Sequence, residues 1–422
     1  MRRWILVGCL VLGLIAMTGS VQAGLLFVPT TYGLSAKSVG LGNAMTAVGD
    51  DYSTTFFNPA ALGSLSANQL DLGYIYAAPQ LSGGPKGNAD AVDFDTANKL
   101  VLVGFTMNLS SLFKNGHGLG LGFDIAMDNN TQSFMAFEES RNDNGQFMRY
   151  GLTSVTMTTG LGVEIIPQLY IGAGGFVMVK GENKLIAETD MAGNTKEEQI
   201  QVSAEPAIAP IASIFAPVHP MVKLGLTYRG KGVAQFDNID AATKALVSES
   251  PLTDLNLVMA FKDTYVPQQA ALGISVMPIK PLMIALDVTW ANWGDYDDEM
   301  KDGDVVKDSA EFETKDLIIP RLGIEYAALE ILQLRFGYYF EDTPFVDPGI
   351  GNTVVLDNAK HAVSIGLGHD MPYIPGLTHA PSIGATYFMH YLVPRTVEAG
   401  DGREFESEGL INGVAATLTL KF

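Results

Sequence analysis

Apolar and polar residues alternate along much of the chain after residue 67. In the segment 222–229 the even-numbered residues are apolar, and the odd-numbered ones are polar or glycine. The segments 284–290, 332–340 and 414–422 show the same period of two. This period places successive side chains on opposite faces of a β-strand, so these segments are predicted to be strands with one apolar face.

Fourteen strands are predicted, and the links between them alternate between long and short. Long, mostly acidic links follow the odd-numbered strands, and short turns such as 166–168 and 278–281 follow the even-numbered ones. An even strand count with short turns at one end is typical of bacterial outer-membrane barrels. The segment 255–266 is merged with the strand after it, because a fifteenth strand would break this alternation. The predicted strands are 67–79, 97–108, 118–128, 148–163, 169–182, 200–215, 221–236, 257–277, 281–294, 314–327, 331–342, 358–369, 380–392 and 409–422.

A soluble β-sandwich would also alternate, but two features favour a membrane barrel. The strands approach the roughly ten residues that cross a bilayer at a tilt. Aromatic residues gather near strand ends, as at Trp290, Trp293 and Tyr296, where an interfacial girdle would lie. The sequence therefore predicts an all-β fold, a 14-stranded antiparallel transmembrane β-barrel.

The first 23 residues resemble a signal peptide. Arg2 and Arg3 precede an apolar run over 4–17, which is too short to span a membrane, and a small-x-small cleavage site ends at Ala23. Cleavage would remove Cys9, the only cysteine, so neither a disulfide nor a thiolate metal site is expected. It would also leave 24 basic residues against 46 acidic ones, a balance that argues against nucleic acid as a partner.

Residues 24–66 lack the period of two and are rich in glycine, alanine and serine. A short helix is expected within 36–49, and turns are expected at Asp50-Asp51 and Asn58-Pro59. A 14-stranded cylinder is too wide for its own side chains to fill. This segment is therefore predicted to be a hatch inside the lumen, with the signal peptide over 1–23 and the barrel over 67–422.

The hatch carries a specific resemblance. A small-residue run, an acidic pair, two aromatics and then Asn58-Pro59-Ala60 resemble the hatch of the outer-membrane long-chain fatty acid and hydrocarbon transporter family. Barrel segments resemble that family in the same order, and they are 267–273, 287–293, 321–326, 334–344 and 361–368. The resemblance implies a bacterial outer-membrane location and passive uptake of hydrophobic compounds such as long-chain fatty acids, monoaromatics or alkanes. It implies no enzymatic activity, cofactor or metal.

The resemblance also implies substrate contacts. Leu25, Leu26 and Phe27 hold the place of family residues that reach the ligand pocket, although they equally suit apolar anchoring of the hatch. The segment 240–247 is expected to form a short capped helix that offers Leu246 and Val247 for external capture, and ordinary loop packing is the alternative.

The third strand carries Gly118, Gly120 and Gly122 on one face. In the family an inward kink of this strand gives a lateral exit, and missing side chains permit a bulge or gap. Alternatively, these glycines make room for the hatch.

Other residues are assigned structural roles. Asn58 is expected to order the hatch turn through side-chain bonds to backbone. Lys223, Arg229 and Arg335 are either a carboxylate clamp or, the favoured interpretation, partners of Asp287 and the hatch acids. The loop 295–313 carries nine acids and two lysines, and Met300 stands where a calcium-binding loop needs glycine, so a solvated loop is favoured.

The expected partners are a hydrophobic ligand, outer-membrane lipid and lipopolysaccharide, and the barrel assembly machinery, which would recognise the terminal Phe422; a monomer is expected. A general porin, a hydrolase and a barrel without a transport role are the competing functions. A porin lacks an N-terminal plug, and the sequence has no Gly-x-Ser-x-Gly elbow.

Overall fold

The computed structural model describes residues 28–422 except 87–91, 95–96, 113–116, 129–130, 138–145, 153–154, 191–194, 248–249, 297–312, 348, 351–352, 356, 376, 378 and 399–403. Within the described residues no helix is both long and apolar enough to cross a membrane.

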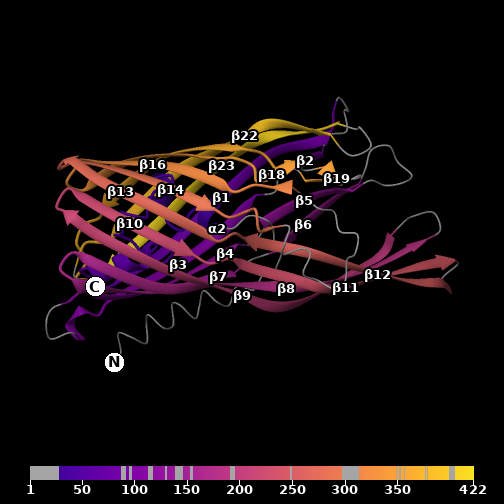
Figure 1. The fold of residues 1–422 in the computed structure, drawn as a ribbon, viewed down its shortest axis with the longest axis horizontal. Coiled ribbons are helices and arrows are strands. Elements are labelled where there is room, and N and C mark those ends of the chain that lie inside the picture. The colour runs from indigo at the N-terminus through magenta and orange to yellow at the C-terminus, as the bar shows by residue number, and fades with distance from the viewer. Residues whose placement is uncertain are drawn as a thin grey trace.

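Fourteen strands of the described chain form one closed antiparallel barrel (Figure 1). Each pairs with the next, and the last closes on the first through Gln69–Pro85 and Phe405–Lys421. This confirms the predicted architecture. The wall strands are β1 (Gln69–Pro85), β3 (Asn98–Asn108), β4 (Leu119–Asp128), β7 (Val155–Ile166), β8 (Leu169–Asp190), β9 (Thr195–His219), β10 (Val222–Arg229), β13 (Gln269–Ile279), β14 (Leu282–Ala291), β16 (Leu317–Leu329), β17 (Leu332–Glu341), β21 (Lys360–Asp370), β22 (Ser382–Glu398) and β23 (Glu404–Lys421).

A long hairpin between β10 and β13 corrects two predictions. It consists of β11 (Gly232–Val247) and β12 (Ser250–Val266), which pair with each other, while β10 pairs directly with β13. The segment 255–266 is therefore not part of the following strand, although the wall still has fourteen strands. The expected helix over 240–247 is also wrong, because pairing with β12 and with β8 holds that backbone extended.

Short strands extend the end of the barrel that carries the long links. Residues 148–152, predicted as part of a wall strand, instead belong to β6 and pair with β5 in a separate small sheet. The short strands at this end of the barrel are β2 (Val92–Phe94), β5 (Thr131–Phe137), β6 (Gln146–Leu152), β15 (Glu313–Thr314), β18 (Phe345–Asp347), β19 (Gly349–Ile350) and β20 (Thr353–Val355).

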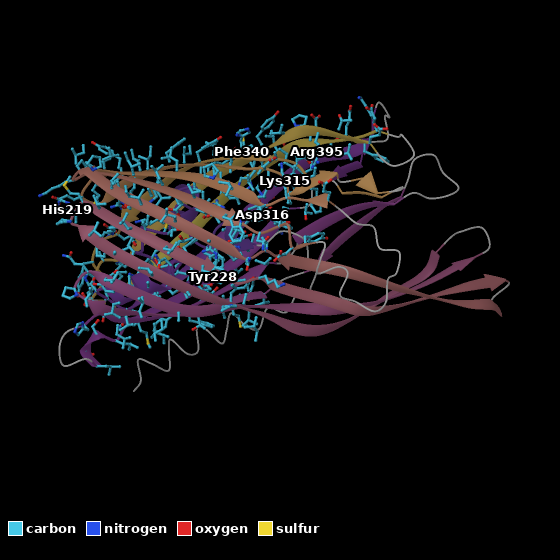
Figure 2. All side chains as sticks on the ribbon, in the orientation of Figure 1. His219, Tyr228, Lys315, Asp316, Phe340 and Arg395 are labelled. Atoms are coloured by element: carbon cyan, nitrogen blue, oxygen red, sulfur yellow. The ribbon has the colours of Figure 1, made fainter. Side chains whose placement is uncertain are left out.

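The two faces of the wall differ as the alternation requires. On β10, Leu226 and Tyr228 are exposed, whereas Thr227 and Arg229 between and beside them are buried toward the lumen. Figure 2 shows side chains around the barrel, with His219 at the short-turn end and Lys315, Asp316 and Arg395 toward the opposite end. An apolar outer surface and a polar inner one are what a lipid-embedded barrel requires.

Residues 28–66 occupy the lumen as short turns of helix. These are α2 (Val28–Thr31), α3 (Ala36–Gly40), α4 (Thr54–Phe57) and the 3₁₀ helix η1 (Pro59–Ser64). Ser35 caps α3 with a reciprocal bond pair to Ser38. The helix is shorter than expected, because Gly42 and Asn43 both have φ of 59°, a left-handed conformation that ends it.

Candidate functional site

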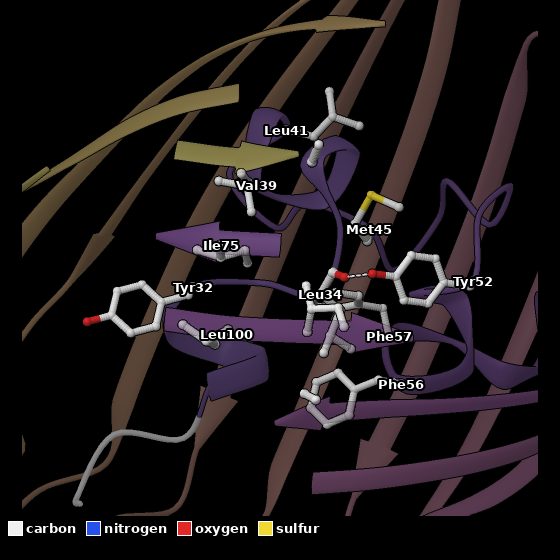
Figure 3. Packing of buried hydrophobic residues seen from close by; sticks show 14 of the residues in the cluster. Tyr32, Leu34, Val39, Leu41, Met45, Tyr52, Phe56, Phe57, Ile75 and Leu100 are labelled. Carbon is white, nitrogen blue, oxygen red and sulfur yellow. Dashed lines mark hydrogen bonds between the residues drawn. The ribbon is translucent and has the colours of Figure 1, made fainter. Parts of the chain in front are cut away.

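The hatch is the centre of the molecule's main apolar core. Tyr32, Leu34, Tyr52 and Phe56 are at most 1% exposed. They pack with wall residues such as Ile75 and Leu100 (Figure 3). The Tyr52 hydroxyl donates a hydrogen bond to the Leu34 carbonyl, which ties two distant parts of the hatch together. The described lumen is therefore filled by the hatch at this level.

Wall side chains bind the hatch backbone. Ser364 donates to the Val39 carbonyl over 2.7 Å, and Thr386 donates to the Ala36 carbonyl over 2.6 Å. Such bonds satisfy backbone groups of the irregular hatch that have no secondary-structure partner. We call eight of these wall residues the hatch anchors: Ser213, Thr227, Asp287, Arg321, Tyr339, Ser364, Thr386 and Thr417. Lys223 on β10 and Asn108 on β3 also donate to hatch carbonyls.

An ion network joins the hatch to β16 and β17. Lys37 contacts Asp50 of the hatch at 2.6 Å and Glu325 of the wall at 3.3 Å. Arg335 binds the same Glu325 at 2.7 Å. Burial lowers the pKa of Lys37, but the carboxylates of Asp50 and Glu325 outweigh it and raise that pKa above its ordinary value. Burial raises the pKa of Asp50, but Lys37 outweighs burial and holds it below its ordinary value, so the pair is charged at neutral pH.

Glycines let the hatch approach the wall closely, on β3 and β4 as well as on β10, β16 and β17. A Cβ atom on Gly104 would overlap the ring of Tyr52, and one on Gly122 would overlap the hydroxyl of Thr55. Backbone of the hatch lies where side chains of Gly118 and Gly120 would be. These contacts need glycine because no Cβ fits.

We predict that Gly104→Ala displaces Tyr52 and destabilises the hatch. The added methyl group has no room, because its position overlaps an aromatic ring fixed by a hydrogen bond to Leu34. The melting temperature should fall by several degrees, as expected for about 1–3 kcal/mol of overpacking. The matched control is Gly175→Ala on β8, where the nearest atom would be 3.1 Å away. Equal melting temperatures for the two variants would contradict the tight fit.

A small cavity lies where the hatch meets β17, β21 and β22. Its space of about 10 Å³ is large enough for one water molecule and too small for a hydrocarbon. Tyr32 of the hatch stacks on His390, with ring centroids 5.9 Å apart, and the Tyr339 ring meets His390 edge-on. The cavity is lined by Thr31, Tyr32, Val39, Gly42, Asn43, Tyr339, Ala362, Val363, Ser364, Phe388 and His390.

An apolar cluster in the wall shares residues with this cavity. We call it the lumen cluster: Ala291, Leu317, Ile319, Tyr339 and Ala362, with Trp293 packed against it. Tyr339 and Ala362 belong to both the cluster and the cavity lining. The lumen cluster therefore adjoins the cavity at the hatch.

The hatch motif, Asn58-Pro59-Ala60, lies where the hatch meets the wall. Asn58 donates from Nδ2 to the carbonyls of Thr46, at 2.7 Å, and Ile214, at 3.1 Å, so its side chain binds backbone as expected. Pro59 begins η1, and the Ala60 amide donates to Ser213 Oγ at 2.8 Å. These bonds fix the position of the turn.

The glycines of the third strand face the hatch. Gly118, Gly120 and Gly122 meet hatch atoms, as the alternative interpretation has it. β4 pairs in continuous register with both β3 and β7. A lateral opening at these glycines stays a prediction, and the ladder is closed there in this structure.

The remaining predicted substrate residues are not placed as side chains. Leu25, Leu26 and Phe27 lie outside the described residues, as do the side chains of Leu246 and Val247, whose backbone belongs to β11. Phe422 is described: its amide donates to the Asn68 carbonyl at 3.1 Å, and its ring stacks on Phe105.

The lumen cations make their direct bonds with other partners than predicted, although the charges of Lys223 and Arg335 act on Asp50 of the hatch and that of Arg229 acts on Asp287. Arg335 binds Glu325 rather than Asp287 or a hatch acid, and Lys223 donates to the Val48 carbonyl at 3.3 Å. Arg229 donates to Gln269 at 3.1 Å, and its guanidinium lies over the ring of Phe56. Asp287 instead accepts from the Thr46 amide at 2.8 Å. The acidic loop 295–313 falls almost entirely outside the described residues.

Comparison with known proteins covers most of the chain. Residues 16–378 match the family model described as outer membrane protein transport protein (OMPP1/FadL/TodX). Alkane uptake protein A of Marinobacter nauticus is 27% identical over 416 residues, which cover 93% of this chain and 91% of that protein.

Two solved structures share the fold. A Pseudomonas aeruginosa FadL homologue has a TM-score of 0.64 at 15% identity, over 94% of this chain and 99% of that one. The P. putida toluene transporter TodX has a TM-score of 0.62 at 14% identity, over 92% of this chain and 98% of that one.

Proposed function

The chain belongs to the OMPP1/FadL/TodX family of outer membrane transport proteins, and from this premise we propose how it moves its cargo. It is a channel of the bacterial outer membrane for hydrophobic compounds, not an enzyme. The proposed cargo is neutral hydrocarbon or long-chain fatty acid, because a relative is an alkane uptake protein and a protein of the same fold transports toluene.

The proposed route enters from the long-loop end and follows the lumen cluster to the hatch. The observation that carries it is the apolar lumen cluster, which shares Tyr339 and Ala362 with the cavity at the hatch. Apolar molecules gain free energy on leaving water for such a surface, at about 25 cal/mol per Å² buried. Net flow then follows the cargo's own gradient.

Several finer roles belong to the proposal. Leu25, Leu26, Phe27, Leu246 and Val247 would contact cargo, and Gly118, Gly120 and Gly122 would border a lateral exit. Phe422 would be read by the barrel assembly machinery, and the protein would act as a monomer in contact with lipopolysaccharide.

Uptake by whole cells tests the proposed function. A bacterial host without channels of this kind would express the protein, and uptake of radiolabelled n-hexadecane, toluene and oleate would be measured. At least one probe should enter markedly faster than in cells with an empty vector. Proteoliposomes should not swell in sugar solutions, because the hatch fills the bore. Rapid sugar entry without hydrocarbon uptake would replace the proposal with a general porin.

We predict that Ala362→Glu abolishes uptake while the barrel still assembles. Ala362 is 4% exposed and belongs to both the lumen cluster and the cavity lining, so a carboxylate there would place charge on the proposed apolar path. Uptake should fall at least about tenfold, which corresponds to 1.4 kcal/mol. Ala362→Val is the control that keeps the site apolar. Heat-modifiable migration in gels reports whether each variant folds.

A further inference from the structure

The short links of the barrel expose bulky apolar side chains. Each of the six links that join wall strands at this end carries, in the link or beside it, an apolar residue at least 50% exposed. One such residue from each link makes up what we call the collar: Leu112, Ile166, Val218, Ile279, Leu329 and Ile374. A contiguous exposed apolar surface marks a place where a protein meets an apolar partner.

A register shift at the turns aims three collar residues at the outer surface. The β7–β8, β13–β14 and β16–β17 ladders each slip by one residue just before the turn. Without the slip, Ile166, Ile279 and Leu329 would continue the lumen-facing row of their strands. After the slip, each lies opposite a leucine of the lipid-facing row on the next strand, and these leucines are Leu169, Leu282 and Leu332. Residues opposite one another share a face, so these bulges extend the outer apolar surface into the turns.

Two aromatic residues mark the other edge of this outer surface, on the long-loop side. The Tyr228 hydroxyl donates to Gln268 at 3.0 Å, and Trp290 Nε1 donates to Asp316 at 2.9 Å. Both rings belong to the lipid-facing rows of β10 and β14, and their partners lie just outside wall strands. Rings with an apolar body and a bonded polar tip are typical of the membrane interface.

An apolar band measured from Trp290 ends at the short turns. Ten residue steps separate Trp290 from Lys280 in the β13–β14 turn. At about 3.4 Å per step and a tilt of about 40°, they span about 26 Å along the membrane normal. The lipid-facing band of an outer-membrane barrel is about 25 Å tall. The turn therefore coincides with the inner edge of the band and does not project beyond it.

We infer that the collar is a lipid-binding surface, which places the short turns of the barrel among the acyl chains of the inner leaflet. The occupant is phospholipid because the collar continues the lipid-facing wall without a polar break. On β13, the exposed residues Leu272 and Ile274 lead down to Ile279. The charged residues Lys280 and Glu330 are exposed at the tips of their turns, where long side chains reach the headgroups.

The arrangement of the collar favours lipid over a protein partner. Each link joins a different pair of strands, so the six collar residues are distributed around the barrel. A docked protein covers one side of such a ring, whereas a bilayer surrounds all of it. The inference concerns the position of the barrel in the membrane and holds whatever cargo the channel carries.

Fluorescence quenching in proteoliposomes tests the inference. The only cysteine, Cys9, lies in the predicted signal peptide, so one introduced cysteine can be labelled with bimane. Ile279→Cys and Leu329→Cys report on the collar. Ile274→Cys, on the lipid-facing row of β13, is the membrane control. Ser66→Cys, an exposed hatch position just before β1 at the same end, is the water control. Heat-modifiable migration in gels checks that each variant is folded.

The collar labels should respond to lipid rather than to water. A phospholipid with a doxyl group near its glycerol should quench them at least about threefold more than it quenches the Ser66→Cys label, and aqueous iodide should give the reverse order. The Ile274→Cys label should be quenched best by a doxyl group near the chain end. In bilayers of shorter acyl chains, iodide quenching of the collar labels should rise, because a thinner band ends above the turns.

Two outcomes would overturn the inference. Iodide quenching of the collar labels equal to that of Ser66→Cys, without quenching by doxyl lipid, places the turns in the periplasm. Protection from iodide in isolated outer membranes but not in proteoliposomes assigns the collar to a protein partner. Neither outcome bears on the proposed transport function, which the uptake assay tests separately.

Discussion

Deletion of residues 28–66 should turn the channel into an open aqueous pore. The described barrel closes through wall pairing alone, with β23 on β1, so the hatch is not needed to complete the sheet. Fourteen strands leave more space than side chains fill. The hatch supplies most of the large buried side chains of the core, including Tyr32, Tyr52 and Phe56.

The expected effect is large. Sugar flux into proteoliposomes should rise by roughly 100-fold, because barrels of slightly greater strand number are water-filled porins. Planar-bilayer recordings should show steady conductance steps that the full-length channel lacks. The control is Asn58→Ala, which removes two side-chain bonds and keeps the hatch.

Failure of the deletion variant to conduct, despite heat-modifiable migration typical of a folded barrel, would show that other segments close the bore. Failure to assemble would instead make the hatch a folding element. The second result is distinguishable because the variant would then be absent from outer-membrane fractions.

The wall was predictable because two solvents impose the pattern. Lipid outside and a polar lumen inside force a period of two, and pairing of neighbours in sequence then closes the barrel. The same rule failed at the β11–β12 hairpin. Local signals at 240–247 favour a capped helix, but a partner strand that follows immediately holds the backbone extended. The helix propensity of eight residues does not reveal whether a neighbouring strand will pair with them instead.

The site was less accessible from sequence than the wall. Gly118, Gly120 and Gly122 indicated missing side chains on one face, yet only the position of the hatch distinguishes a close fit from a gap. Ser364 and Thr386 belong to no motif of the sequence, and their partners are carbonyls of an irregular segment more than 300 positions away. No periodicity encodes that register.

Charge pairing in the lumen illustrates the same limit. The cations Lys223 and Arg335 were expected to find Asp287 or hatch acids, because a buried cation needs a partner. They do find partners, but Arg335 uses Glu325, its neighbour across the β16–β17 ladder. That a buried cation needs a partner follows from its residue type. Which residue becomes the partner follows from the strand register.

We expect Glu325→Ala to loosen the hatch more than removal of any exposed charge. Glu325 holds both Lys37 and Arg335, whose side chains are 16% and 9% exposed, so its loss leaves two cations largely buried without a carboxylate on the wall. Breaking a buried pair this way costs about 3–5 kcal/mol. We expect a cost at the lower end of this range, because Lys37 keeps its ion pair with Asp50, whose side chain is 45% exposed.

Cysteine labelling measures the effect directly. Ala44→Cys places a thiol at a fully buried hatch position in an otherwise cysteine-free mature chain, so maleimide reacts only when the hatch loosens. About 3 kcal/mol should raise the labelling rate by roughly 100-fold. The matched control is Lys315→Ala, which breaks an ion pair with Asp342 of the same short length, 2.7 Å, but with both side chains more than 40% exposed.

The comparison isolates burial as the cause. An exposed pair contributes about 1 kcal/mol or less, so the control should leave hatch labelling unchanged. Replacing all three buried charges at once, Lys37→Met with Glu325→Leu and Arg335→Met, should recover much of the loss, because no unpaired charge remains in the network's wall half. If the single Glu325→Ala variant labels no faster than the Lys315→Ala control, the ion network does not hold the hatch, and the eight anchors alone set its stability.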